Sequence, residues 1–298
     1  MVARAPRRLS APGASPAALD ALRGRLVARP AVRSVAEYLD RVFGAIAAWG
    51  LDRRPMPPLW YRGVRAYRWA LTPGAYRGNG CDELSLFLRF RSDAPLLLPR
   101  EPVDDWDWYV TMQHYGIPTR LLDWTESPLV ALFFAVGDAE PGDAPGVWLL
   151  DPFEFNRATF DWEDGHVLDT THDDLGAWLP LALEARPTTF TPARGLGDVP
   201  HTARSNAWPV AIAGRHGTAR SRAQRGTFTV HGVDVAAIDE HVVRTQGHAE
   251  GRIDLIRVEP RALPQLQREL RQLAFTRSLI FPEPENLAAD LRAMYVRP

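Results

Sequence analysis

The chain has 298 residues, enough for one large or two modest domains with a sizeable buried core. Its formal net charge of −1 gives no global field that would attract nucleic acid or an anionic membrane, although a local basic groove stays possible. All 35 basic residues are arginine, and the absence of lysine excludes a lysine Schiff base and a Walker-type phosphate-binding lysine.

The single cysteine, Cys81, excludes an intramolecular disulfide and a cysteine-rich zinc site, and an inert thiol is favoured over a catalytic one. No apolar run approaches the roughly 18 residues of a membrane span. The first thirty residues also lack the apolar core of a secretory signal. We therefore expect a cytoplasmic protein with no membrane partner, and the sequence leaves its oligomeric state open.

The N-terminal part of the chain mixes arginine, alanine and proline. Residues 1–32 are expected to be loosely ordered, with a short helix inside them, and one folded domain is expected over residues 33–298. Ser34 and Glu37 have the spacing of a capping box, apolar residues then recur at helical spacing, and Gly50 is placed to end this first helix.

Helices and strands follow in separate segments with no regular alternation, which favours an α+β domain. Strands are expected at residues 59–64, 146–152, 226–232 and 252–260, and helices at 82–94, 102–116, 128–136, 262–275 and 286–296. Residues 153–209 read as a loop-rich insertion with short, ambiguous elements. Because that is long for a compact domain, the segment is a lid, a partner-binding insertion or a set of wrongly assigned elements.

Several motifs of known chemistry are missing. The sequence contains no G-x-S-x-G, no H-E-x-x-H, no phosphate loop, and no G-x-G-x-x-G that opens a helix. The eight histidines are scattered without a metal-ligand spacing, so no metal site is expected. Metal-assisted hydrolysis is disfavoured, although distant carboxylates can still meet in space.

Arg62 is the first polar residue placed within an apolar segment, the strand at 59–64. Alternation puts Tyr61 and Gly63 on one face of this strand and Arg62 on the other. A half-buried arginine is costly unless it meets a carboxylate, a phosphate or carbonyl groups. Gly63 permits the close approach of another backbone or of a ligand. A ligand contact and a purely structural ion pair are equally favoured.

The second candidate is the stretch HYGIPTRLLDWTESPLVALFFAV, residues 114–136. Gly116 begins a turn, after which polar residues precede an apolar helix that Ser127 caps. The segment before this helix is polar because it contains Thr119, Arg120, Asp123, Trp124 and Thr125. Threonine hydroxyls and free backbone N–H groups near a helix start suit anionic or carbonyl ligands. An internal pair of Asp123 with Arg120 or Arg62 explains the same residues, and on this stretch alone it is favoured.

Two later segments complete the set. Arg220 and Gln224 lead into the strand at 226–232, and a glutamine side chain suits an amide or a ribose hydroxyl. The alternative is a surface strand with a polar start. At the C-terminal end, Phe281 and Pro282 form a packed turn, and Glu283 or Glu285 is placed to cap the last helix. There the structural interpretation is favoured.

These four segments, in this order, resemble the FRG domain, a bacterial family named for an aromatic-Arg-Gly motif. The motif is Tyr61-Arg62-Gly63 here, with tyrosine in the place of phenylalanine. Residues 114–136 are similar to the central signature of the family, RAQRGTFTV to its Gln-Gly-Phe segment, and SLIFPEPENLAADL to its closing segment. The resemblance extends over about residues 34–291.

A weaker resemblance links the chain to ADP-ribosyltransferases of the Arg-Ser-Glu kind. WYRGV is similar to their Tyr-Arg-Gly strand, and Thr119 through ALFFA is similar to their hydroxyl strand and the helix that follows it. The strand near Gln224 falls where their glutamate strand lies. This resemblance implies a central mixed or antiparallel split sheet flanked by helices, with NAD as substrate and a macromolecular acceptor, either a protein or a nucleic acid. A toxin or a phage-defence effector has such an activity.

By that resemblance Arg62 anchors the NAD pyrophosphate, Thr119 braces the nicotinamide pocket and Gln224 contacts the ribose. A guanidinium can hold a pyrophosphate in bidentate fashion. Gln224 has no charge with which to stabilise a developing cation, so Glu283 or Asp123 is the candidate carboxylate. The expected nucleotide contacts are Tyr61, Arg62, Gly63, His114, Tyr115, Gly116, Thr119, Arg120, Asp123, Trp124, Thr125 and Arg220. The alternative is a nucleotide- or nucleic-acid-binding module without catalysis.

Overall fold

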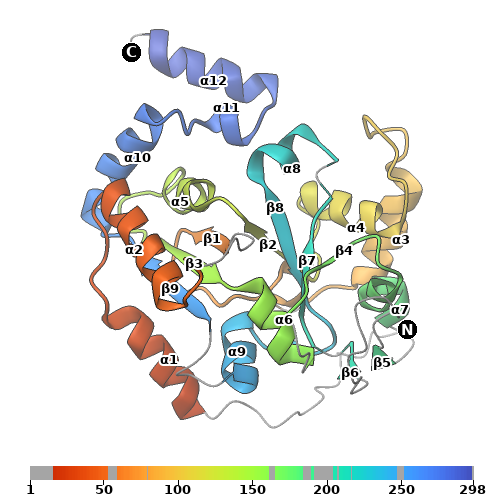
Figure 1. The fold of residues 1–298 in the computed structure, drawn as a ribbon. Coiled ribbons are helices and arrows are strands. Elements are labelled where there is room, and N and C mark those ends of the chain that lie inside the picture. Colours follow the sequence, from red (N-terminus) through yellow and green to blue (C-terminus); the bar gives the residue numbers. More distant parts are fainter. Residues whose placement is uncertain are drawn as a thin grey trace.

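A computed structural model describes residues 16–52, 59–78, 80–160, 165–183, 189–190, 204–206, 208–215, 217–246 and 252–296. Its centre is a seven-stranded sheet with the order β4-β7-β8-β2-β1-β3-β9 (Figure 1). All neighbouring strands are antiparallel except β4 and β7, which are parallel. The expected α+β domain with a mixed sheet between helices is therefore confirmed.

The strands of this sheet are short, and most of their residues are buried because helices cover both faces. Their bounds are β1 Trp60–Val64, β2 Leu121–Thr125, β3 Gly146–Leu150, β4 Leu168–Asp169, β7 Val210–Ala213, β8 Gly226–Val230 and β9 Ile253–Arg257. A separate two-stranded pair joins β5 Thr189–Phe190 and β6 Arg204–Ser205. Four of the central strands lie where apolar runs of the sequence predict them.

Several of the helices begin at a capping side chain, namely Ser34, Asp82, Asp104, Ser127, Thr218 or Thr276. The bounds are α1 Pro16–Ala28, α2 Val35–Ala48, α3 Glu83–Asp93, α4 Asp105–His114, α5 Pro128–Val136, α6 Pro152–Phe160, α7 Pro180–Leu183, α8 Ala219–Gln224, α9 Ile238–Gln246, α10 Leu263–Gln272, α11 Arg277–Ile280 and α12 Pro284–Tyr295. Short 3-10 turns cover Gly74–Tyr76, Asp173–Trp178 and Pro260–Ala262. Ser34 caps α2 and Ser127 caps α5, as expected, although Glu37 accepts from the N–H of Arg33 instead of that of Ser34.

Two apolar clusters share one face of the sheet. In the first, α2, α5 and α10 pack on β1, β3 and β9, with Tyr38, Leu132 and Leu266 fully buried around Tyr61. In the second, α3 and α4 pack on β2, β8 and β7. The opposite face carries a single cluster, in which α1, α6 and α9 pack on β1, β2, β3, β7 and β9. The first face therefore has a boundary between its two clusters, over the β1–β2 junction.

Strands β1 and β2 meet at this boundary by only one register pair, Tyr61 with Thr125. By contrast, β1 pairs with β3 along five positions, and β2 pairs with β8 along five positions. Extending the β1–β2 register would pair Gly63 with Asp123, and that pair does not form. The sheet is therefore split at the strand that carries Arg62.

Two segments are better ordered than their composition suggests. Within residues 1–32 the expected short helix is α1, which buries Leu22 and Leu26 against the sheet; residues 1–15 lie outside the described residues. Within the expected loop-rich segment 153–209, α6 is a regular helix whose Phe155 is fully buried. Asp151 accepts hydrogen bonds from two N–H groups in the first turn of α6, which explains why the helix begins after the Asp-Pro pair.

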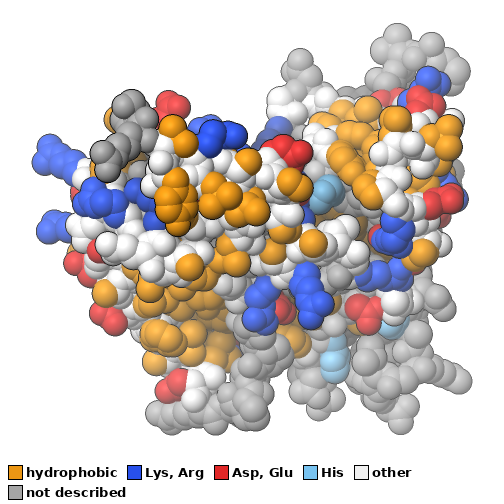
Figure 2. Space-filling model, turned by 90° about the horizontal axis from the view of Figure 1, so that it is seen from above, with side chains coloured by type: hydrophobic (Ala, Val, Ile, Leu, Met, Phe, Trp, Pro, Cys, Tyr) orange, Lys and Arg blue, Asp and Glu red, His pale blue; other side chains and the backbone are white. Residues whose placement is uncertain are grey.

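The last helix, α12, buries none of its residues and lies at the edge of the molecule (Figure 1). Seen from above, hydrophobic side chains gather there and again over the loop between α3 and α4 (Figure 2). Leu287 and Met294 on α12 and Leu96 and Leu97 on the loop are exposed. In the described part of the chain, no helix combines the length and apolar character needed to cross a membrane.

Candidate functional site

A cavity of about 320 Å³ lies at the split between β1 and β2. Its lining comes from both faces of the parted strands and from the helices on either side of the cluster boundary. The lining residues are Tyr61, Arg62, Gly63, Val110, Gln113, His114, Asp123, Trp124, Thr125, Phe134, Arg220, Ser221, Gln224, Gly226 and Phe228. Asp123 is the only carboxylate among them, and Arg62 and Arg220 are the only cationic side chains.

Arg62 reaches across the split. Its Nη1 donates a hydrogen bond to the main-chain oxygen of Asp123 at 2.6 Å and lies 3.9 Å from the carboxylate Oδ2 of the same residue. Its side chain is 18% exposed. Burial lowers the pKa of Arg62, and the nearby charge of Arg77 lowers it further, whereas Asp123 raises it. The guanidinium stays charged because the usual pKa of arginine is far above 7. Most of its five N–H donors make no bond within the described chain, so they are free to meet an anion.

The carboxylate of Asp123 is held from the other side by a glutamine on α4. Gln113 Nε2 donates to Asp123 Oδ2 at 2.9 Å, and Gln113 Oε1 accepts from the hydroxyl of Thr119 at 2.5 Å. Thr119 is fully buried and also accepts from the N–H of Leu121. Thr119 therefore orients Asp123 through Gln113 and lies behind the cavity wall, where it cannot touch a ligand.

On the opposite rim, a histidine, an arginine and the C-terminal segment come together. Arg220 stacks over the ring of Phe281, 4.6 Å from its centroid, and its Nη1 lies 3.9 Å from Glu283 Oε1. Phe281 also packs edge-on against Phe134. Burial and the charge of Arg220 lower the pKa of His114, although Glu283 and Asp123 act to raise it. The imidazole is therefore neutral at pH 7. The closing segment thus contributes to the cavity rim as well as to packing.

Gln224 leads into β8, as expected. It is the last residue of α8, and Arg225 in the left-handed conformation connects it to the strand. Its side-chain nitrogen donates to the carbonyl of Ile280 at 3.2 Å, and its own carbonyl accepts from Thr125 Oγ1 at 2.6 Å. These bonds tie α8 to α11 and to β2, while the side chain still lines the cavity.

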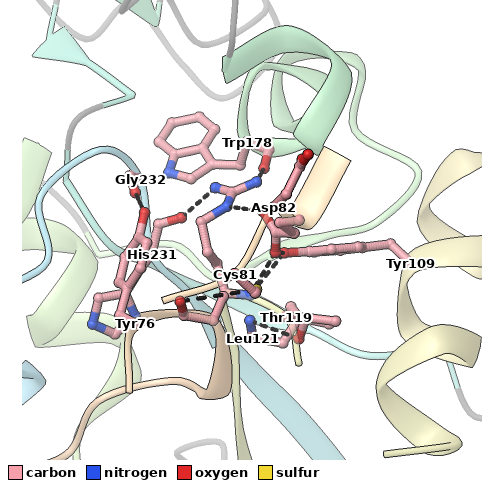
Figure 3. Close-up of polar contacts among 12 residues, drawn as sticks. Tyr76, Cys81, Asp82, Tyr109, Thr119, Leu121, Trp178, His231 and Gly232 are labelled. Atoms are coloured by element: carbon pink, nitrogen blue, oxygen red, sulfur yellow. Dashed lines mark hydrogen bonds and ion pairs between the residues drawn. The ribbon is translucent and has the colours of Figure 1, made fainter. Parts of the chain in front are cut away.

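A separate, buried network lies where β2 begins and β8 ends, and Figure 3 labels Tyr109, Trp178 and His231 in it. Arg120 is at its centre. Its guanidinium is 4% exposed and bonds Glu83 at 2.5 Å and the carbonyls of His231 and Trp178 at 2.7 and 2.5 Å. Burial acts to lower the pKa of Arg120, but Tyr109 and Glu83 outweigh it and raise that pKa. Each nitrogen of this guanidinium donates to a protein group, so Arg120 holds the fold together and lies away from the cavity.

Gly63 serves helix packing. A Cβ atom on Gly63 would lie 1.9 Å from the carbonyl oxygen of Ala131 and 2.6 Å from the N–H nitrogen of Ala135. Helix α5 therefore lies directly on β1 at this position, which only glycine allows. The sequence left open whether Gly63 permits the approach of another backbone or of a ligand, and the structure shows the backbone of α5 there.

The cavity collects most of the residues that the sequence singles out. Those it brings together are Tyr61, Arg62, Gly63, His114, Asp123, Trp124, Thr125, Arg220 and Gln224. Tyr115 and Gly116 lie in the exposed turn after α4, and Thr119 and Arg120 are buried elsewhere. Sequence reasoning missed Gln113, Phe134 and Phe228. Alternation from Gly226 would have found Phe228, whereas nothing local marks Gln113 or Phe134.

The described residues contain no group of three or more histidine, cysteine, aspartate or glutamate side chains that could hold a metal ion. The cavity instead offers two guanidinium groups for anions, aromatic rings for a planar group and one oriented carboxylate. Such a set suits a phosphate-bearing ligand with a flat ring.

Residues 57–144, which include β1, α3, α4, β2 and α5, match the model of the FRG domain family. No curated protein and no solved structure matches the chain.

Proposed function

Because this chain carries an FRG domain, we propose that its cavity at the β1–β2 split binds NAD and that the protein transfers ADP-ribose to a macromolecule. A role as a toxin or a phage-defence effector belongs to the same proposal. The supporting observation is that segments far apart in sequence, around Arg62, Asp123 and Gln224, line one cavity.

The groups around the cavity suit this chemistry. Arg62 presents N–H donors at the split, where a pyrophosphate would find a bidentate partner. Trp124 and Phe228 provide aromatic surface for the nicotinamide ring. A cavity of about 320 Å³ is at the small end of ligand sites, so it would hold the nicotinamide riboside end while the adenosine end extends outside.

Asp123 is the carboxylate we assign to the reaction. In the transfer the bond between the ribose C1′ and the nicotinamide nitrogen breaks, and its electron pair leaves with nicotinamide. The acceptor nucleophile then forms a bond to C1′ and gives its proton to a base or to water. Positive charge develops on the ribose, and a fixed carboxylate beside it stabilises that charge. Gln113 fixes Asp123 at 2.9 Å, so the carboxylate needs no reorganisation.

Nucleotide binding without transfer is the second candidate, and one observation favours it. Gln224, which takes the place of the acidic residue of the transferases, is uncharged and donates its side-chain N–H to Ile280. A protein of this kind would bind NAD and leave it intact.

The test is a calorimetric titration of NAD into the wild type and Arg62→Ala, followed by an assay of nicotinamide release on the same samples. We expect binding that Arg62→Ala weakens at least tenfold, and nicotinamide release that Asp123→Asn abolishes. Arg89→Ala serves as the control, because Arg89 is an exposed arginine on α3 whose partner is Asp93 in the next turn.

The outcomes separate the two candidates. Binding with no release across a range of protein and nucleic-acid acceptors would favour the binding module. No binding of NAD by the wild type, or equal binding by Arg62→Ala and Arg89→Ala, would contradict both uses of this cavity.

A further inference from the structure

A second cavity, of about 300 Å³, lies on the face of the sheet that α1, α6 and α9 cover. Its floor is a register pair of two neighbouring strands, Trp148 of β3 and Leu255 of β9. Its walls are α1, with Leu26 and Val27, and the segment at residues 67–70 that follows β1. Most of the lining side chains are apolar, so the cavity suits an apolar group of about one or two rings. It shares no lining residue with the cavity at the β1–β2 split.

Tyr67 lies between this cavity and the next register pair on the same face, Gly146 with Arg257. A Cβ atom on Gly146 would lie 2.9 Å from the Cβ of Tyr67, so the tyrosine packs directly on β3. The guanidinium of Arg257 lies 5.5 Å from the centroid of the Tyr67 ring, and that of Arg68 lies 5.4 Å from it. Two cations therefore lie against one ring that lines the cavity.

A third arginine joins them, and no carboxylate neutralises the group. Arg65 lies 6.0 Å from the centroid of the Trp69 ring. Within the described part of the chain, Arg65, Arg68 and Arg257 form no ion pair, and Arg257 donates only to the carbonyl of Arg29. The whole chain has a net charge of −1, so this positive charge is a local feature. Like charges repel one another, and an anion bound among them would relieve that repulsion.

The mouth of the cavity offers one guanidinium and one flat ring to a ligand. Arg23 and Arg68 both line the cavity, but Arg23 is paired with Asp239 at 2.9 Å. Arg68 is exposed and keeps its N–H donors for a ligand. Trp69 is 53% exposed, so a flat apolar group can lie on its ring. A single available guanidinium matches a singly charged carboxylate, which it can bind in bidentate fashion.

We propose that this second cavity binds an arylcarboxylate, independently of the cavity at the split and of the transfer reaction. The ring system of the ligand enters the cavity between Tyr67 and Trp69, where it leaves water. The carboxylate stays at the mouth and accepts hydrogen bonds from Arg68. Arg65 and Arg257 strengthen the attraction for the anion through their charge. Such a ligand carries both features of the site, an apolar flat body and one negative charge.

The experiment is a calorimetric titration of 2-naphthoate into the full chain, with 2-naphthamide as a neutral ligand of similar shape. The titration is repeated on Arg68→Gln, Trp69→Leu and Arg62→Ala. Arg271→Gln is the matched control, because Arg271 is also exposed but lies on α10, which packs on the other face of the sheet. Thermal melting of each variant verifies that it is folded.

We expect 2-naphthoate to bind the wild type and 2-naphthamide to bind at least tenfold more weakly. Arg68→Gln should weaken the binding of 2-naphthoate at least tenfold, because the bidentate contact is lost. Trp69→Leu should weaken the binding of both ligands, and Arg271→Gln and Arg62→Ala should leave it unchanged.

Three results would each overturn the proposal: no binding of 2-naphthoate, equal affinity for the two ligands, or equal effects of Arg68→Gln and Arg271→Gln. Loss of binding in Arg62→Ala would place the ligand in the cavity at the split and would overturn it as well.

Discussion

Two arginines that the sequence places in the same polar set have opposite surroundings. Arg120 is enclosed, with Glu83 and two main-chain carbonyls around its guanidinium. Arg62 makes one hydrogen bond of 2.6 Å and is partly open to a cavity. A guanidinium whose three nitrogens all donate to protein groups stabilises the fold, and one that has nitrogens without a partner at a cavity is available to a ligand. The number of satisfied donors, and not burial alone, separates the two roles.

The largest expected effect is on stability. Arg120→Ala leaves the buried carboxylate of Glu83 without its cation, which should cost about 3–5 kcal/mol of the free energy of unfolding. Arg62→Ala removes one hydrogen bond and should cost about 1 kcal/mol. Urea denaturation of both variants measures the difference. Equal losses of stability in the two variants would contradict the assignment of a structural role to Arg120 and a ligand-binding role to Arg62.

The second effect concerns His231, whose carbonyl accepts from Arg120. Burial lowers the pKa of this histidine to about 3, although its bond to Ala236 acts in the opposite direction. An unfolded histidine titrates near 6.5, so between pH 6.5 and 3 the unfolded state binds more protons and stability falls as the pH falls.

At pH 5 this single group should remove about 2 kcal/mol of stability relative to pH 7. Urea denaturation at both pH values, on the wild type and His231→Gln, measures its share. The variant should lose less stability on acidification than the wild type does. The same loss in both proteins would mean that His231 does not titrate in this way. His114, at the cavity, can be replaced by glutamine as a comparison.

The smallest effect concerns Thr119, which is buried and is linked to Asp123 at the cavity through Gln113. Thr119→Val removes the hydroxyl that fixes Gln113 and should cost about 1 kcal/mol of stability. Through the loosened Asp123 it should also slow nicotinamide release, while Thr119→Ser keeps the hydroxyl and should restore both. If Thr119 contacted the ligand, Thr119→Val would instead lower NAD affinity strongly with little change in stability. That result would contradict the position of Thr119 behind the cavity wall.

The sequence by itself determined the elements with strong local signals. Ser34, Ser127 and Pro128 predict helix starts through hydrogen bonds and dihedral preferences within a few residues, and α2 and α5 begin there. Apolar runs predicted β1, β3, β8 and β9, because burying such a run requires an extended, covered strand. The FRG motifs were likewise visible in residue order, and residues 57–144 match that family.

Only the tertiary structure decided which polar residues share a site. Arg120 and Asp123 are three positions apart, yet the first is enclosed by Glu83 and the second lines the cavity, because Glu83 lies on a helix that no local pattern connects to Arg120. The partner of Asp123, Gln113, comes from α4. The split between β1 and β2 depends on register, which is set by the packing of α5 on Gly63 and of α4 on β2. Such contacts depend on residues distant in the chain, so local propensity has no access to them.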